Sequence, residues 1–163
     1  MLEDVKTLQQ HWGGVSEIID RWLEERRDML VKYCELSEIK SFDGSNDSHG
    51  TKLQRFCEVM VDYVSVGHFE VFEQLAGEGK AFSDKDGLLQ GAELMDKIQP
   101  STEELLDFND KYLATDDLET LSIDLSAIGE TLAQRFESED KMIEVLHNAH
   151  LAQLMPAQEI DSA

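Results

Sequence analysis

The last third of the chain carries a row of apolar residues at helical spacing, and this row constrains the fold more than any other feature. Its members recur every three or four positions, which places them on one side of a helix; they are Leu118, Leu121, Leu125, Ile128, Leu132, Phe136, Ile143 and Leu146. The row predicts a helix over residues 117–150. A straight helix of that length would measure about 50 Å at 1.5 Å per residue, whereas a compact domain of this size is about 40 Å across. We therefore expect a bend or break near Ser138.

Apolar stripes elsewhere predict further helices, and only two prolines interrupt the chain. Ser16 is a suitable N-cap for the first of them. Pro100, followed by the sequence STEE, indicates a helix start with Ser101 as N-cap and Glu104 completing a capping box. We predict long helices at 16–36, 51–66, 101–115 and 117–150, and a shorter one at 83–97.

These helices predict an all-α fold with an antiparallel four-helix bundle core and additional short helices. A chain of 163 residues suits one domain with one sizeable core. We expect a single helical domain over residues 1–155 and a disordered tail at 156–163, following Pro156.

Residues 61–75, VDYVSVGHFEVFEQL, could form either a hairpin or a corner between two helices. The valines favour a strand, but the apolar period of residues 51–66 extends over more than three helical turns, so we favour the corner. Gly67 could then supply a left-handed cap that ends one helix, with the next helix beginning near His68.

Negative charge dominates the composition, with 35 acidic residues against 14 Lys and Arg and a net charge of -21. Direct binding to DNA, RNA or anionic lipid is disfavoured, because phosphate contacts need Lys and Arg. A basic protein partner is compatible with this charge, although acidity that serves only solubility is the simpler reading. Residues 101–140 alone hold twelve acids and two bases, so an acidic docking surface is expected in the later helices.

The chain contains no apolar run near the roughly 20 residues that a membrane helix needs, and its acidic, polar N-terminus does not resemble a signal peptide. Cys34 and Cys57 are not spaced as metal ligands, and we expect two buried thiols in a reducing environment. A cytoplasmic protein without membrane association is predicted, as a monomer or weak homodimer.

Motifs for catalysis or cofactor binding are weak. The loop at 41–50 resembles the opening of an EF-hand but lacks the required Gly and Glu, and GEGK at 77–80 lacks the rest of a phosphate loop. Glu144 and His147 form one Glu-x-x-His element, whereas di-iron bundles need two. We expect a solvated helix face there and no cofactor. A metal protein or enzyme using the carboxylates and His147 remains the alternative function.

Three segments together resemble the Rsd/AlgQ family, bacterial regulators that bind the primary sigma factor of RNA polymerase. These segments are 18–36, 56–75 and 125–143. The residues that carry the resemblance are Asp20-Arg21-Trp22-Leu23, Phe56-Cys57, Val61-Asp62-Tyr63, Gly67-His68-Phe69, Ile128-Gly129-Glu130, Arg135-Phe136 and Glu139-Asp140-Lys141. The resemblance spans most of residues 1–150 and fades at 41–50 and 76–100.

The resemblance implies a helical bundle that binds the C-terminal promoter-reading domain of the sigma factor, in competition with polymerase core and promoter DNA. That domain carries a basic helix-turn-helix, which suits an acidic partner. Asp62, Ser65 and Phe69 match positions that contribute to sigma binding in the family. The residues alone would also allow a buried Phe69 and a merely solvated Asp62.

Two charged residues interrupt apolar stripes. Arg26 lies within the stripe of residues 16–36, and Glu139 continues the row of the last helix. A charge that faces a core is costly unless it is paired. We hypothesise that Arg26 pairs with an acid on a neighbouring helix, first Glu139 and second Asp62; the alternative is an Arg26 side chain that extends to water.

Overall fold

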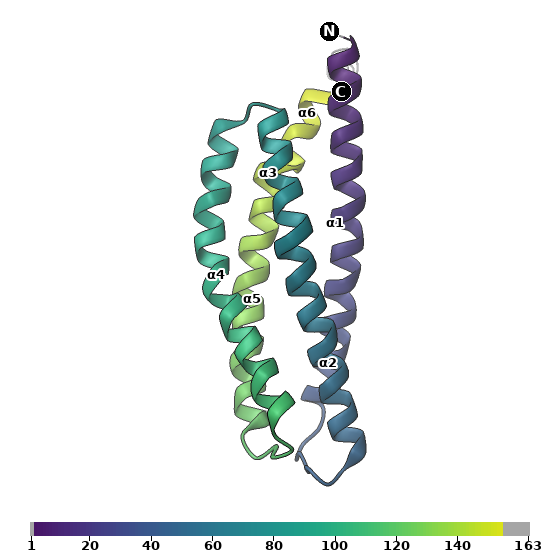
Figure 1. Cartoon of the computed structure of the whole chain (residues 1–163), viewed down its shortest axis with the longest axis vertical. Coiled ribbons are helices and arrows are strands. Elements are labelled where there is room, and N and C mark those ends of the chain that lie inside the picture. The colour runs from purple at the N-terminus through teal and green to yellow at the C-terminus, as the bar shows by residue number, and fades with distance from the viewer. Residues whose placement is uncertain (1, 155–163) are drawn as a thin grey trace.

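The computed structural model describes residues 2–154 as long helices joined by short connections (Figure 1). The long helices are α1 (Leu2–Ser37), α2 (Asp47–Val66), α4 (Lys85–Ala114) and α5 (Leu121–Leu146). The shorter pieces are a π-helical turn at Gly67–Val71, α3 (Phe72–Ala81), a 3-10 turn at Asn148–His150 and α6 (Leu151–Leu154). No strand occurs within residues 2–154, and the predicted all-α class is confirmed.

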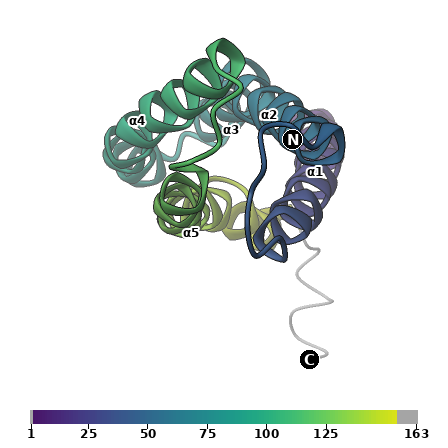
Figure 2. The same cartoon turned by 90° about the horizontal axis from the view of Figure 1, so that it is seen from below.

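The helices alternate in direction around one core, with α3 extending α2 (Figures 1 and 2). The backbones of α4 and α5 pack most closely, followed by those of α1 and α2. Large side chains from all four long helices are buried between them, including Trp22, Phe56, Leu105 and Leu132. The predicted antiparallel four-helix core is therefore the observed one.

Side-chain caps fix the starts of two helices. The side chain of Asn46 accepts a hydrogen bond from the backbone N–H of Ser48 at 2.9 Å, which begins α2 at Asp47. Asp84 accepts from the N–H of Gly87 at 2.8 Å and begins α4. Each cap satisfies a donor that the first turn of a helix would otherwise leave free.

The first helix begins well before the predicted residue 16, and the prediction of Ser16 as its N-cap was wrong. Gly13 and Gly14 are poor helix formers, yet the helix runs through them because the flanking residues are held by tertiary contacts. The ring of Trp12 stacks on that of His147 with centroids 4.3 Å apart, and Val15 is buried.

Pro100 lies inside α4, so the two helices predicted at 83–97 and 101–115 are one, and Ser101 is not an N-cap. Proline lacks the N–H that an interior position donates and crowds the preceding turn. Figure 1 shows the axis of α4 changing direction partway along its length. The hydroxyl of Ser101 donates instead to the carbonyl of Ile98, at 2.5 Å.

The bend or break predicted near Ser138 was also wrong, because α5 continues without interruption to Leu146. The molecule is elongated and not compact, since α1 alone has 36 residues and spans about 54 Å. The helical path changes only at His147, whose φ of -135° and ψ of -63° begin the 3-10 turn.

The corner predicted after Val66 does not form. Gly67 has φ -56° and ψ -51°, which is right-handed helix and not the predicted left-handed cap. The N–H of Phe72 donates to the carbonyl of Gly67, five residues earlier, and this bond marks a π turn. α2 and α3 are thus one continuous helical rod with a widened turn at Gly67–Val71.

The prediction of two buried cysteines is confirmed for one of them and wrong for the other. Cys57 is buried, and burial raises the pKa of its thiol to about 12, whereas Cys34 is exposed, contrary to the prediction. The tail at 156–163 lies outside the described residues. Within residues 2–154, no helix is both long and apolar enough to cross a membrane.

Candidate functional site

Asp62, Ser65 and Phe69 follow one another along the outward side of the α2–α3 rod. Buried neighbours on α2, among them Met60 and Tyr63, turn the opposite side of this helix to the core. Asp62 is exposed, Ser65 is half-buried, and Phe69 is 71% exposed. The spacing of three and four residues keeps positions on one side of a helix. An aromatic side chain held in water is available for contact with another molecule.

A group of carboxylates lies beside this face. Burial raises the pKa of Glu25 on α1, and the negative charges of Asp62 and Glu70 raise it further, while Arg21 opposes them. The Oε2 atom of Glu25 is buried and has no hydrogen-bond partner among the described residues. Arg21 approaches Glu70 only to 4.0 Å. The group therefore favours an incoming cation, since an added Lys or Arg would relieve repulsion between like charges.

The π turn packs on the ring of Trp22, which is held in a fixed position by Tyr63. Trp22 stacks on Tyr63, with ring centroids 4.8 Å apart and planes within 4°, and its indole N–H donates to the Tyr63 carbonyl at 3.0 Å. A Cβ at Gly67 would lie 2.9 Å from the Trp22 ring. The close approach of Trp22 thus favours glycine here, because any side chain would crowd the ring. π turns often occur at functional sites, and this one carries Phe69 at its centre.

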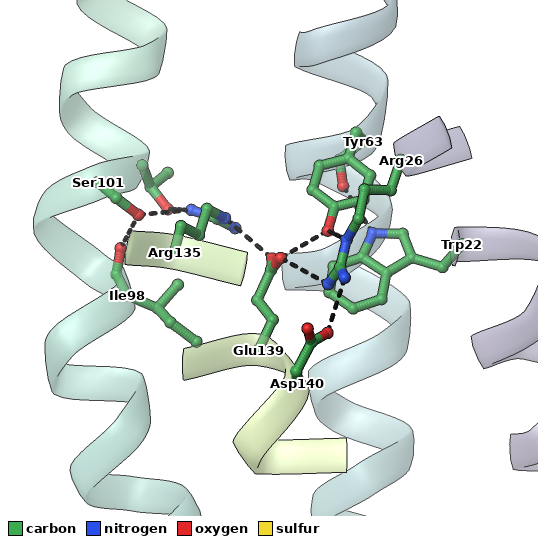
Figure 3. Close-up of polar contacts among 9 residues, drawn as sticks. Trp22, Arg26, Tyr63, Ile98, Ser101, Arg135, Glu139 and Asp140 are labelled. Atoms are coloured by element: carbon green, nitrogen blue, oxygen red, sulfur yellow. Dashed lines mark hydrogen bonds and ion pairs between the residues drawn. The ribbon is translucent and has the colours of Figure 1, made fainter. Parts of the chain in front are cut away.

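A buried polar network fixes the rod to the other helices (Figure 3). The Glu139 carboxylate of α5 accepts from the Tyr63 hydroxyl at 2.5 Å, from Arg26 at 3.2 Å and from Arg135 at 2.9 Å. Burial raises the pKa of Glu139, and the two guanidinium groups oppose that shift. Arg135 also donates to Ser101 of α4 at 3.0 Å, so the network includes all four long helices.

The hypothesis that Arg26 pairs with Glu139 is confirmed. Arg26 additionally donates to Asp140 at 2.7 Å and to the Tyr63 hydroxyl at 3.0 Å. Asp62, the second candidate, is not among its partners. The two interrupted stripes identified the pair because each charge continued a row of core-facing positions.

Comparison with known proteins identifies the family. Residues 1–147 match the family described as "Regulator of RNA polymerase sigma(70) subunit, Rsd/AlgQ". This chain belongs to the Rsd/AlgQ family. The resemblance that the sequence motifs indicated is therefore confirmed over most of the chain.

Several Rsd/AlgQ relatives carry the name "Regulator of sigma D". The protein from Pectobacterium carotovorum subsp. carotovorum (strain PC1) is 33% identical over 153 residues, covering 91% of this chain and 99% of the relative. The protein from Salmonella paratyphi B is 34% identical over 158 residues, covering 91% and 93%. The protein from Yersinia enterocolitica is 32% identical over 149 residues, covering 88% and 89%.

Sequence reasoning missed one part of the candidate site in this Rsd/AlgQ chain, namely the carboxylate that α1 places beside Asp62. Glu25 lies 37 positions before Asp62, and no stripe or motif links the two. Their proximity depends on how α1 and α2 pack. The interrupted α1 stripe does locate Arg26, and the position of Glu25 directly before it is a signal that could have indicated this residue.

The solvated helix face predicted at Glu144 and His147 was wrong for the histidine. His147 and His150 are 3% and 1% exposed, and their Nδ1 atoms lie 2.5 Å and 2.6 Å from the two carboxylate oxygens of buried Glu78. The reversal follows from the end of α5 at Leu146, which turns these rings inward. Glu144 is exposed as predicted.

The alternative of a metal site finds no candidate in the described part of the chain. There, no three His, Cys, Asp or Glu side chains lie together in a way that could hold a metal ion. Glu78 is engaged by both histidines, and His150 also contacts Asp84 at 2.7 Å through Nε2. These side chains therefore form a structural cluster that fixes the segment after α5 against α3.

Proposed function

We propose that this chain binds the C-terminal promoter-reading domain of the primary sigma factor through the face formed by Asp62, Ser65 and Phe69, and thereby keeps it from polymerase core and promoter DNA. The observation that carries this proposal is Phe69, a large aromatic side chain that is 71% exposed beside the carboxylates of Asp62, Glu25 and Glu70. Aromatic anchors next to charged groups are typical of interface hot spots.

Charge supports the same partner. A domain that reads promoter DNA carries a basic helix-turn-helix, and this chain has a net charge of -21. In the proposed complex, a Lys or Arg of the sigma domain lies among Glu25, Asp62 and Glu70, while Phe69 packs on an apolar side chain. A protein that occupies the DNA-reading surface in this way excludes DNA by competition and needs no contact with nucleic acid itself.

The proposal includes the remaining properties expected from the sequence. Residues 1–155 act as a single sigma-binding domain, in the cytoplasm, as a monomer or weak homodimer. The activity is binding without catalysis and requires no cofactor.

Two substitutions test the face: Phe69→Ala and Asp62→Ala, with binding to the purified C-terminal sigma domain measured by calorimetry. Truncating a central interface aromatic costs about 2–4 kcal/mol, which raises Kd about 30-fold to 1000-fold. Asp62→Ala should also raise Kd. Because both residues are exposed, their melting curves should match that of the unsubstituted protein.

A matched control is Leu89→Ala on α4, since Leu89 is 64% exposed but lies outside the face. Its affinity should remain within about twofold of the original. Unchanged affinity of the Phe69→Ala, Asp62→Ala double variant, with its fold intact, would exclude this face as the docking site.

A further inference from the structure

A groove lies between α2 and α4 at the end of the molecule where the two long connections meet. Its volume is about 510 Å³. Its lining includes four buried side chains, Leu53, Cys57, Tyr112 and Leu118. Figure 2, viewed onto this end, shows α2 beside α4, with the connections crossing the end. At Gly44 the first connection passes so close to the carbonyl of Asp116 that a Cβ there would collide with it.

An exposed leucine lines this groove. Leu113, near the end of α4, is 79% exposed, more than any other large hydrophobic residue within the described part of the chain. In residues 2–154 the intramolecular packing leaves its side chain almost entirely uncovered. A leucine in this position offers a partner apolar area to bury. It lies beside the buried side chains that line the groove.

The groove carries charge of one sign. Asp47, Glu58 and Asp116 line it, and its lining includes no Lys, Arg or His. A basic side chain that entered would meet three carboxylates without a competing cation. The charge of the groove therefore favours a basic segment as occupant.

The groove is continuous with the proposed sigma-binding face. Glu58 precedes Asp62 by four residues, Ser65 by seven and Phe69 by eleven, so all four share one side of the α2–α3 rod. The distance along the rod from Glu58 to Phe69 is about 16 Å at 1.5 Å per residue. One helix of a partner, lying along the rod, is long enough to reach from the aromatic side chain to the groove.

We propose that this groove is a second docking surface for the same partner, filled by a basic amphipathic helix. A Lys or Arg of that helix faces Glu58 and Asp116, and an apolar side chain covers Leu113. This inference rests on the proposed function, because it assigns the groove to the sigma domain that contacts Phe69.

The test measures the Kd of the full-length chain for the purified C-terminal sigma domain after two separate substitutions, Leu113→Ser and Glu58→Gln. Leu113→Ser should raise Kd about tenfold, and Glu58→Gln should raise it in the same direction. Ile123→Ser and Leu89→Ser are matched controls, since these residues are 73% and 64% exposed and neither lines the groove. Both controls should stay within about twofold of the unsubstituted affinity.

The outcomes separate the two proposals. If Phe69→Ala weakens binding while Leu113→Ser and Glu58→Gln leave it unchanged, the groove proposal is overturned and the proposed function stands. Failure of the unsubstituted chain to bind the sigma domain overturns both. A self-association that Leu113→Ser abolishes, with sigma affinity unaffected, assigns the groove to a second copy of the chain and also overturns the proposal. Matching thermal melts show that every variant is folded.

Discussion

Gly67 illustrates how one missing methyl group determines the packing of the site. The residue lies where the α2–α3 rod crosses Trp22, and the indole is fixed by its stacking on Tyr63 and by its hydrogen bond to the Tyr63 carbonyl. The backbone at Gly67 is ordinary helix, so any residue could adopt it. What restricts this position to a small residue is therefore the narrow space between the α2–α3 rod and Trp22 of α1.

Gly67→Ala should lower the free energy of unfolding by about 1 kcal/mol. The new Cβ would meet Trp22 at 2.9 Å, and crowding a packed core costs about 1–3 kcal/mol, against a gain of up to about 1 kcal/mol in helix propensity. Urea unfolding measures the difference.

Gly14→Ala is the matched control, because it is also a helical glycine but has nothing within 4 Å of an added Cβ. It should stabilise the protein by about 0.5–1 kcal/mol. Equal unfolding midpoints for the two variants would disprove the steric account.

At the scale of elements, the buried carboxylate of Glu139 connects three neighbouring helices to α5. It accepts hydrogen bonds from Arg26 of α1 and Tyr63 of α2. Arg135 of α5 also donates to it and donates in turn to Ser101 of α4. α1 and α5 share little close backbone packing. Side chains that extend from one helix to the other, among them Arg26 and Tyr33 of α1, therefore link the two helices in place of close backbone packing.

Glu139→Gln should lower the free energy of unfolding by about 3–5 kcal/mol, because it leaves the fully buried guanidinium of Arg135 without its counter-charge. Asp140→Asn is the control, since Asp140 also pairs with Arg26 but its side chain is 60% exposed. Its loss should cost less than about 1 kcal/mol. Similar denaturation curves for the two variants would contradict a central role for Glu139.

Sequence periodicity predicted the long helices because one face of each is apolar. It failed where a residue that usually ends a helix is held inside one by tertiary contacts. Gly13 and Pro100 are normally helix breakers, yet both lie inside helices whose flanking residues are packed. The π turn at Gly67–Val71 also escaped prediction, because glycine next to histidine indicates a helix end unless the position of Trp22 is known.

The candidate site was partly predictable for the same reasons. Asp62 and Ser65 lie off the apolar stripe, so their outward position could be derived. The exposure of Phe69 could not, because a phenylalanine after an apolar segment is usually buried. Glu25 required knowledge of which helices pack together.

At the scale of the molecule, we expect the charge of -21 to affect the rate of association with a basic partner more than the rate of dissociation. In the proposed complex, the association rate with the sigma domain should fall as salt rises, because exposed charges are screened beyond about 8 Å near 0.15 M ionic strength. The dissociation rate should change less. Stopped-flow mixing at a series of salt concentrations measures both rates, and an association rate indifferent to salt would remove electrostatic steering from the account.

The length of α1 has a hydrodynamic consequence. A helix of 36 residues, about 54 Å long, makes the molecule a short rod (Figure 1). A rod experiences more friction than a sphere of equal mass, and it elutes earlier from a gel-filtration column calibrated with spherical standards. A monomer of this chain will therefore imitate a larger species. Light scattering or sedimentation equilibrium, which report mass independently of shape, are the measurements that distinguish one copy from two.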